Sequence, residues 1–119
     1  HAPHAPQEKE SPFEDAPFGV TGLETAFASC YTYLVEPGLV PLDVLVRRMS
    51  ADAAAAVGLP VPTLADGAVA DVALIDTAAR ERVGDRGFQS RSTNSAFLGE
   101  ELHGRVLLTL AGGQIAWRT

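Results

Sequence analysis

The stretch HAPHAPQEKESPFEDAPFG, residues 1–19, decides how the rest of the chain is interpreted. It contains four prolines and mixes histidines, acids and one lysine, without any apolar periodicity. Such a segment cannot form a core of its own, and its composition is too varied for a flexible linker. We therefore expect a proline-stiffened loop that forms one wall of an active site, with the other walls outside this chain.

Length, charge and cysteine content restrict the class of protein. A chain of 119 residues allows one modest domain. A net charge of -6 argues against a nucleic-acid partner, which would need a basic face. No signal-peptide segment and no apolar run of about 18 residues are present, so we expect no membrane partner. A single cysteine, Cys30, fits a reducing compartment, and we expect a cytoplasmic location.

Residues 21–59 are predicted to be helical. Thr21 and Glu24 have the spacing of a capping box, which predicts the start of the first helix. Apolar residues then recur at helical spacing and predict one buried stripe: Leu23, Phe27, Cys30, Tyr31 and Leu34. Pro37-Gly38 should end this helix, a second should begin at Pro41, and an Ala-rich third should cover residues 53–57.

The second half of the chain is predicted to form short strands after a connector at residues 60–68. Residues 69–75 and 80–83 are expected to be two strands, followed by a long polar loop over residues 84–99. Residues 105–111 and 114–118 should pair as a hairpin through Gly112-Gly113. Three or four strands with one apolar face need a cover, and the helices are too short to supply all of it. We therefore expect uncovered apolar surface.

The residue pattern alone gives little evidence for a metal site in residues 1–19. His1 and His4 are three apart, but Pro3 between them prevents the helix that would align two ligands. The spacing favours solvent-exposed loop histidines. The neighbouring acids lack a helix to align them and are expected to be solvated, with Lys9 balancing their charge.

The order of the residues indicates more than their spacing. The first 26 residues closely resemble the last βα loop of bacterial dihydroorotases of the class I type, in the amidohydrolase superfamily. The matching stretches are HAPH at 1–4, EKE at 8–10, APFG at 16–19 and GLETA at 22–26. Later matches are Phe88, Ser90-Arg91-Ser92, Asn94 and Phe97-Leu98-Gly99. The chain departs from the family at Asp52-Ala53, usually Asn-Pro, and at Ala96, often Pro.

The resemblance implies an α/β fold: the C-terminal portion of a metal-dependent TIM-type barrel plus strands of a small β-sandwich. Residues 1–59 would be the end of the barrel, with the active-site loop at 1–19 and helices at 21–59. Residues 60–119 would be the C-terminal strands of the composite sandwich. A complete barrel takes about 250 residues, so the chain would be roughly the last quarter of such an enzyme.

The resemblance also implies a reaction and a cofactor. Dihydroorotases catalyse the reversible cyclisation of N-carbamoyl-L-aspartate to (S)-dihydroorotate in pyrimidine biosynthesis, with one or two zinc ions. The family's proton-shuttling aspartate would stand directly before His1, and the zinc ligands would lie upstream. We therefore expect no catalytic residue and no metal ligand within this chain, and no activity from the chain alone.

Substrate binding is the role that the resemblance assigns to this chain. His4 matches the histidine that grips the substrate carboxylate, and Phe18 and Gly19 match positions that touch the substrate through the backbone. His1 is expected to be a structural or supporting residue, with no role carried over from the family.

Two other functions remain open at this point. One is a non-catalytic, dihydroorotase-like scaffold partner of aspartate carbamoyltransferase. The other is a free-standing binding module, which the uncovered strands disfavour. A homodimer and a transcarbamoylase partner are left open alongside the small-molecule substrate.

Overall fold

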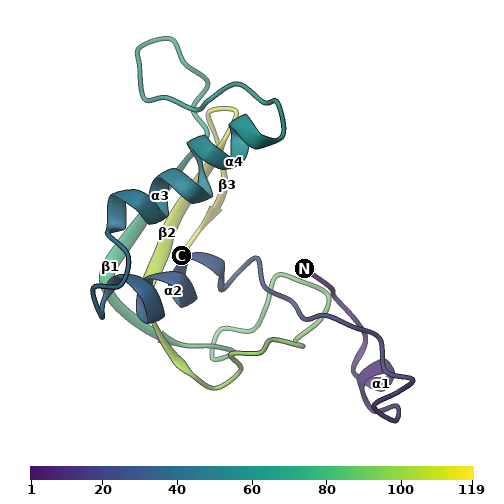
Figure 1. Ribbon diagram of the computed structural model, residues 1–119. Coiled ribbons are helices and arrows are strands. Elements are labelled where there is room, and N and C mark those ends of the chain that lie inside the picture. Colours follow the sequence, from purple (N-terminus) through teal and green to yellow (C-terminus); the bar gives the residue numbers. More distant parts are fainter.

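The computed structural model describes all 119 residues as a small α/β chain whose helices and sheet meet mainly at one end (Figure 1). Five short helices precede a three-stranded antiparallel sheet of order β1-β2-β3. The elements in order are α1 Pro6–Lys9, α2 Ala26–Cys30, the π-helix η1 Tyr31–Val35, α3 Leu42–Met49, α4 Ala51–Ala56, β1 Val72–Arg82, β2 Glu101–Ala111 and β3 Gln114–Arg118. No helix combines the length and apolar character needed to cross a membrane.

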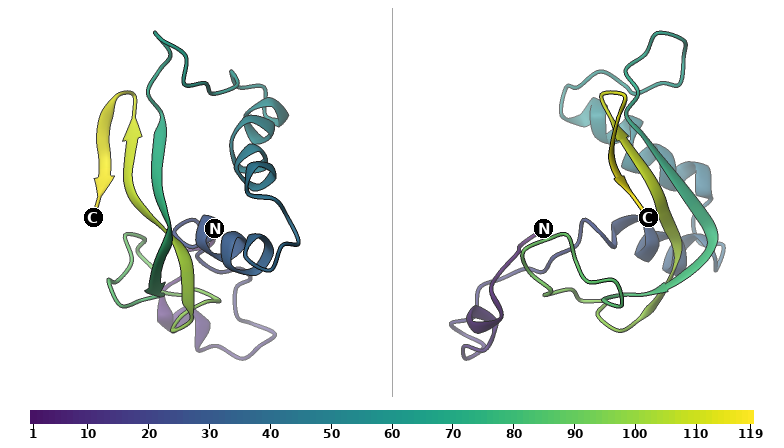
Figure 2. Two further views of the ribbon diagram at one scale, coloured as in Figure 1. Left: turned by 90° about the vertical axis from the view of Figure 1, so that its left-hand side faces the viewer. Right: turned by 180° about the vertical axis from the view of Figure 1, so that it is seen from behind.

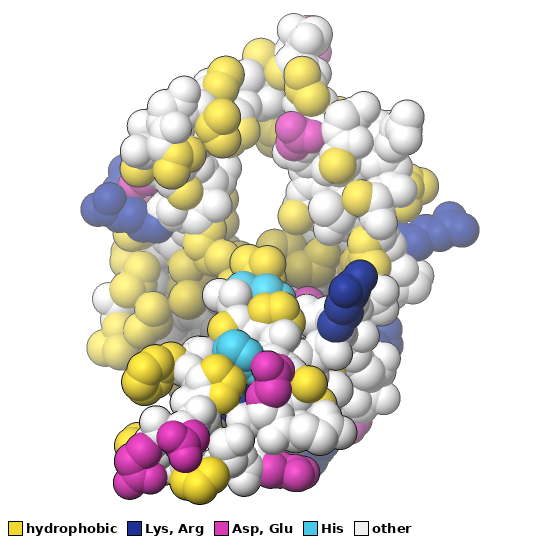
Figure 3. Space-filling model, turned by 90° about the vertical axis from the view of Figure 1, so that its right-hand side faces the viewer, with side chains coloured by type: hydrophobic (Ala, Val, Ile, Leu, Met, Phe, Trp, Pro, Cys, Tyr) yellow, Lys and Arg dark blue, Asp and Glu magenta, His cyan; other side chains and the backbone are white.

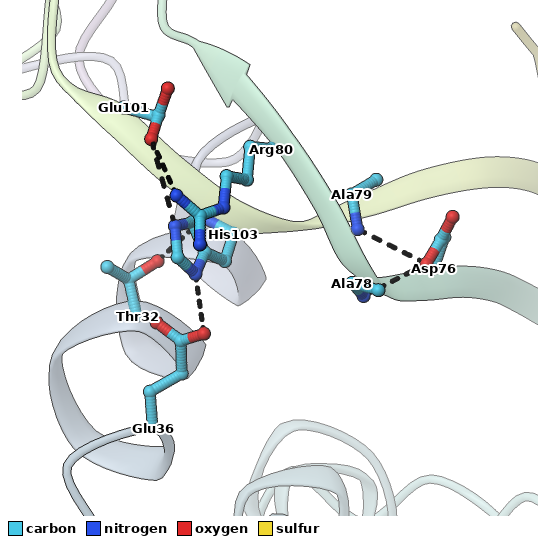
Figure 4. Close-up of polar contacts among 8 residues, drawn as sticks. All are labelled: Thr32, Glu36, Asp76, Ala78, Ala79, Arg80, Glu101 and His103. Carbon is cyan, nitrogen blue, oxygen red and sulfur yellow. Dashed lines mark hydrogen bonds and ion pairs between the residues drawn. The ribbon is translucent and has the colours of Figure 1, made fainter.

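The first strand is longer than predicted. The expected separate strands at 69–75 and 80–83 are wrong, because β1 runs continuously over Val72–Arg82. Its pairing with β2 shifts register between Asp76 and Arg80. At this bulge the Asp76 carboxylate accepts hydrogen bonds from the amides of Ala78 and Ala79, at 2.9 and 3.2 Å (Figure 4). The side chain thus replaces the lost ladder bonds and lets one strand continue.

The predicted hairpin is confirmed. β2 and β3 are joined at Gly112-Gly113, although β2 begins earlier than expected, at Glu101. The Asp71 carboxylate accepts from the Gly112 amide at 2.7 Å, and the Gly113 amide donates to the Ala70 carbonyl at 3.0 Å. The chain entering β1 therefore also secures the turn between β2 and β3.

The first helix begins later than predicted. The capping box at Thr21 is wrong: α2 starts after Thr25, and Glu24 binds a distant loop instead. Phe27 and Tyr31 do form a packed face, with ring centroids 5.9 Å apart, and they lie over Gly104 of β2. A Cβ at Gly104 would lie 2.9 Å from the Phe27 ring. Leu23, predicted for the same stripe, is 72% exposed because it precedes the helix.

The two later helices occur where they were expected. α3 follows Pro41, and α4 covers the Ala-rich stretch, starting two residues earlier than predicted. Asp52 links them through ion pairs with Arg47 and Arg48 at 3.5 and 3.2 Å. Leu45 is the buried residue of α3, and α3 packs beside η1.

The helix pair stands away from the sheet, and much apolar surface is uncovered. Figure 2 shows α3 and α4 facing the sheet across a gap, and the space-filling view confirms an opening between the two layers (Figure 3). Leu45 and Leu102 are the buried hydrophobic residues, whereas Leu42, Val46 and Leu74 are exposed. The radius of gyration is 16.1 Å, against about 13.5 Å for a compact chain of this length. The expected uncovered surface is therefore confirmed.

Candidate functional site: the N-terminal loop

The N-terminal loop, residues 1–19, projects from the end of the molecule opposite the β2–β3 hairpin (Figure 1). Its one regular element is the single turn α1, which begins at Pro6. The Glu8 carboxylate accepts from the Ala5 amide at 2.7 Å and so closes the start of this turn. In the space-filling view of the right-hand side of Figure 1, histidine side chains are visible at the surface, and acidic side chains lie lower in the view (Figure 3).

The two ends of the loop lie against each other. The Ala2 amide donates to the Val20 carbonyl at 2.8 Å. Gly19 has a φ of 93°, and a Cβ at this position would lie 2.7 Å from the Ala2 Cβ. Only glycine allows both this backbone conformation and this approach. The loop is therefore a closed excursion of the chain rather than an open tail.

Side chains bind three consecutive backbone carbonyls at the base of the loop. The Lys9 ammonium donates to the Pro17 carbonyl and, at 2.8 Å, to the Gly19 carbonyl. His4 Nε2 lies 3.0 Å from the Phe18 carbonyl, and Asn94 Nδ2 donates to Gly19 at 3.2 Å. The expected role of Lys9 as a charge-balancing residue is therefore wrong, because its ammonium is committed to carbonyl oxygens.

The structure brings the three predicted binding residues together. His4 is partly buried, with 25% of its side chain exposed, and it contacts Phe18 directly through the carbonyl. A carbonyl oxygen can only accept, so His4 carries its proton on Nε2, and its Nδ1 lies 3.9 Å from Glu8. The amides of Phe18 and Gly19 donate to no group of the chain. The imidazole thus contacts the Phe18 carbonyl, and the amides of Phe18 and Gly19 are free on the adjoining backbone.

His1 joins the loop to the segment before α2. Its Nδ1 accepts from the amides of Gly22 and Leu23 at 3.2 and 3.3 Å. An accepting Nδ1 places the proton of the neutral ring on Nε2, which lies 3.5 Å from the Ser90 hydroxyl. The sequence predicted a structural role for His1 but not its partners, which are more than 20 residues away.

Glu24 fixes the polar loop 84–99 beneath the N-terminal loop. Its carboxylate accepts from the Gln89 amide at 2.9 Å and from the Ser90 amide and hydroxyl at 2.9 and 2.7 Å. Burial alone would raise the pKa of Glu24, but the Ser90 hydroxyl and the Gln89 and Ser90 amides together hold that pKa below its ordinary value. The Thr21 amide adds a bond to the Asn94 carbonyl at 2.8 Å.

A second polar cluster, around His103, lies where η1 meets β2 (Figure 4). His103 Nδ1 lies 2.5 Å from Glu36, and its backbone amide donates to the Thr32 hydroxyl at 2.8 Å. Glu101 lies 4.0 Å from His103 Nε2 and pairs with Arg80 at 3.5 Å. Sequence reasoning missed this cluster, because it depends on strand register and helix packing.

The donor set of this chain does not fit a metal ion. No group of three or more His, Cys, Asp or Glu side chains lies close enough together to hold one. The histidines of the N-terminal loop instead bind backbone groups.

Comparisons with known proteins extend the resemblance to the whole chain. No family model matches. Curated dihydroorotases from Bacillus thuringiensis (strain Al Hakam) and Bacillus cereus (strain AH187) are each 39% identical over 118 residues, 99% of this chain. The chain spans 28% of the length of these relatives. The predicted resemblance to dihydroorotases is therefore confirmed.

Solved structures show the same fold. The D-hydantoinase (dihydropyrimidinase) of Thermus sp. matches with a TM-score of 0.86 and 27% identity, over 99% of this chain and 27% of that protein. The D-hydantoinase of Bacillus sp. AR9 matches with a TM-score of 0.77 and 24% identity, over 89% of this chain and 24% of that protein. The elements described above thus have the arrangement of one part of a larger amidohydrolase.

Proposed function

We propose that this chain, similar to dihydroorotases over its whole length, is the C-terminal part of a cyclic amide hydrolase of pyrimidine metabolism. The reaction would be the reversible cyclisation of N-carbamoyl-L-aspartate to (S)-dihydroorotate. Sequence identity of 39% with curated dihydroorotases supports this substrate class. The observation that carries the proposal is the contact of His4 with the Phe18 carbonyl at the base of one closed loop, where the amides of Phe18 and Gly19 are free.

The uncovered surface supports the proposed domain assignment, which the resemblance implies. Residues 1–59 would complete a barrel, with residues 1–19 as its active-site loop, and residues 60–119 would be strands of a composite sandwich. Both layers expose large apolar side chains, among them Val46 on α3 and Leu74 on β1. A barrel needs about 250 residues, so the missing cover would come from the rest of a longer protein.

The loop suits an anionic substrate. Free amides and an imidazole are hydrogen-bond donors, and a carboxylate accepts from both. Because Nε2–H of His4 donates to the Phe18 carbonyl, a bound carboxylate would approach the ring at Nδ1. The Glu8 carboxylate lies 3.9 Å from the same nitrogen. His4 therefore both supports the loop and presents Nδ1 to the ligand.

Zinc is proposed only for the parent protein, the longer protein of which this chain would be the C-terminal part. When bound, zinc lowers the pKa of a coordinated water toward neutrality. The side chains of this chain do not gather into a metal site. The ligands, and the proton-shuttling aspartate expected directly before His1, would be contributed by other parts of the parent.

The test is an assay of the full-length parent with dihydroorotate as substrate. Turnover that requires bound zinc is the expected result. A purified, folded parent that leaves dihydroorotate unchanged contradicts the proposal. If that inactive parent also co-purifies with aspartate carbamoyltransferase and carries a residue other than aspartate before His1, it is the non-catalytic scaffold.

A further inference from the structure

We infer that Lys9 is a positioning residue that orients the main-chain amides of the substrate site, an inference that rests on the proposed function. The ammonium binds the carbonyls of Pro17 and Gly19, the residues on either side of Phe18. Neither the charge pattern nor the resemblance assigns it this role. Its effect on a substrate would pass through the backbone rather than through contact with the ligand.

Because the peptide unit is planar, a side chain that fixes the carbonyl of one residue also fixes the direction of the next residue's amide. In a trans peptide the C=O of one residue and the N–H of the next point in opposite directions. Fixing the Pro17 carbonyl on Lys9 therefore directs the Phe18 amide away from the ammonium. The same relation directs the Val20 amide away from Lys9, through the Gly19 carbonyl. His4 fixes the Gly19 amide in the same way, through the Phe18 carbonyl.

The amides oriented in this way are free to bind a ligand. Phe18, Gly19 and Val20 donate to no other group of the chain, although each of the three preceding carbonyls is occupied. The Phe18 and Val20 amides, both directed away from Lys9, are preoriented main-chain donors, and such donors are a common means of binding anions. The site therefore has its donors fixed before the substrate arrives, which lowers the ordering cost of binding.

Neighbouring contacts hold the Lys9 side chain in place. The ammonium is partly buried, and its residue ends α1, whose first turn is closed by Glu8 and begins with Pro6. Asn94 reinforces the same arrangement from the other side, by donating to the Gly19 carbonyl at 3.2 Å. A compact ammonium with rotatable donors can serve two carbonyls at once, and a neutral side chain of equal length cannot.

The test compares Lys9→Met with Glu10→Gln in the full-length parent. Glu10 is the adjacent charged residue and is exposed, and its side chain makes no hydrogen bond or ion pair. We expect Lys9→Met to raise KM for dihydroorotate roughly ten- to hundred-fold, with kcat changed less than about three-fold, since oriented binding is lost rather than chemistry. Asn94→Ala should raise KM less, because Lys9 still holds the Gly19 carbonyl. Glu10→Gln should leave KM unchanged.

A second readout separates this inference from the proposed function. A crystal structure of the Lys9→Met parent should show the Pro17 and Gly19 carbonyls turned away from their wild-type directions, with or without substrate. If the wild type fails to turn over dihydroorotate, the proposed function falls and these carbonyl directions alone decide the role of Lys9. Unchanged carbonyl directions, or an equal rise in KM with Glu10→Gln, overturn the inference.

Discussion

The Glu24 carboxylate accepts hydrogen bonds from both the amide and the hydroxyl of Ser90, a residue 66 positions later in the chain. This contact joins the segment before α2 to the polar loop 84–99. The Ser90 hydroxyl also lies 3.5 Å from Nε2 of His1. The base of the N-terminal loop is therefore supported by a part of the sequence that sequence periodicity would assign to a separate unit.

The Glu24 contact predicts a pH-dependent contribution to stability. The folded pKa of Glu24 lies below its ordinary value, because the hydrogen bonds from Ser90 and Gln89 outweigh burial, which acts to raise it. The stabilisation is therefore complete above the ordinary pKa of about 4.3 and is lost as the pH falls through the lowered folded pKa. We expect Glu24→Gln to lower the free energy of unfolding by less than about 1 kcal/mol at pH 7, since the carboxylate is exposed.

The measurement is thermal unfolding of the full-length parent at pH 7 and at about pH 3 to 4. The difference between wild type and Glu24→Gln should shrink toward zero at the acid end. Glu14→Gln is the matched control, because Glu14 is exposed and has no hydrogen-bond or ion-pair partner. A difference that persists undiminished in acid would show that the charge of Glu24 is irrelevant.

Gly104 sets how closely α2 approaches the sheet. We expect Gly104→Ala to destabilise the protein by about 1–3 kcal/mol, since the new methyl group overpacks the site and the backbone conformation is strained for alanine. The methyl carbon would lie 2.9 Å from the Phe27 ring at a φ of 89°. Gly22→Ala is the control, because nothing lies within 4 Å of its Cβ position. Equal melting temperatures for both variants would mean that α2 does not pack here.

His1 is predicted to stabilise the loop as a hydrogen-bond acceptor. His1→Leu leaves the amides of Gly22 and Leu23 without their partner and should cost about 1 kcal/mol. His1→Asn retains an acceptor near the position of Nδ1 and should recover much of this loss. Chemical unfolding of the three parent proteins measures the difference. If asparagine is no better than leucine, acceptance by Nδ1 is not what His1 contributes.

His103 and Glu36 should be energetically coupled across the junction between η1 and β2. A double-mutant cycle with His103→Ala and Glu36→Ala should give a coupling free energy of about 0.5–1 kcal/mol, because the pair is partly exposed. Strictly additive effects of the two substitutions at low salt would contradict the pairing.

The proposed substrate-binding role of His4 predicts a loss of turnover without a loss of metal. His4→Ala in the parent should lower kcat/KM for dihydroorotate by the equivalent of about 2–3 kcal/mol, the scale of a charge-assisted hydrogen bond lost in a binding site. The zinc content should stay at the wild-type value, which metal analysis of the purified protein measures. Zinc lost together with the side chain would assign His4 to the metal instead.

Local patterns predicted the elements whose causes are local. The Gly112-Gly113 hairpin, the helix after Pro41 and the Ala-rich helix before Gly58 each depend on residues within a few positions of one another. The capping box failed because the Glu24 carboxylate gains more partners from loop 84–99 than the Thr21 amide could offer. Asp76 similarly turned two predicted strands into one.

In the candidate site, too, the sequence predicted some features and missed those that depend on distant parts of the chain. Sequence order identified His4, Phe18 and Gly19, and the structure brings them together. It could not identify the backbone partners of Lys9 or His1, since these depend on which groups the closed loop presents to them. Three-dimensional closure of the loop, set by Gly19 against Ala2, is the step that no pattern of residue types encodes.

The most direct test of the account is a crystal structure of the full-length parent with dihydroorotate bound. The substrate carboxylate should lie within hydrogen-bond distance of His4 and of at least one of the amides of Phe18 and Gly19. A substrate bound elsewhere, with these amides still unoccupied, would contradict it.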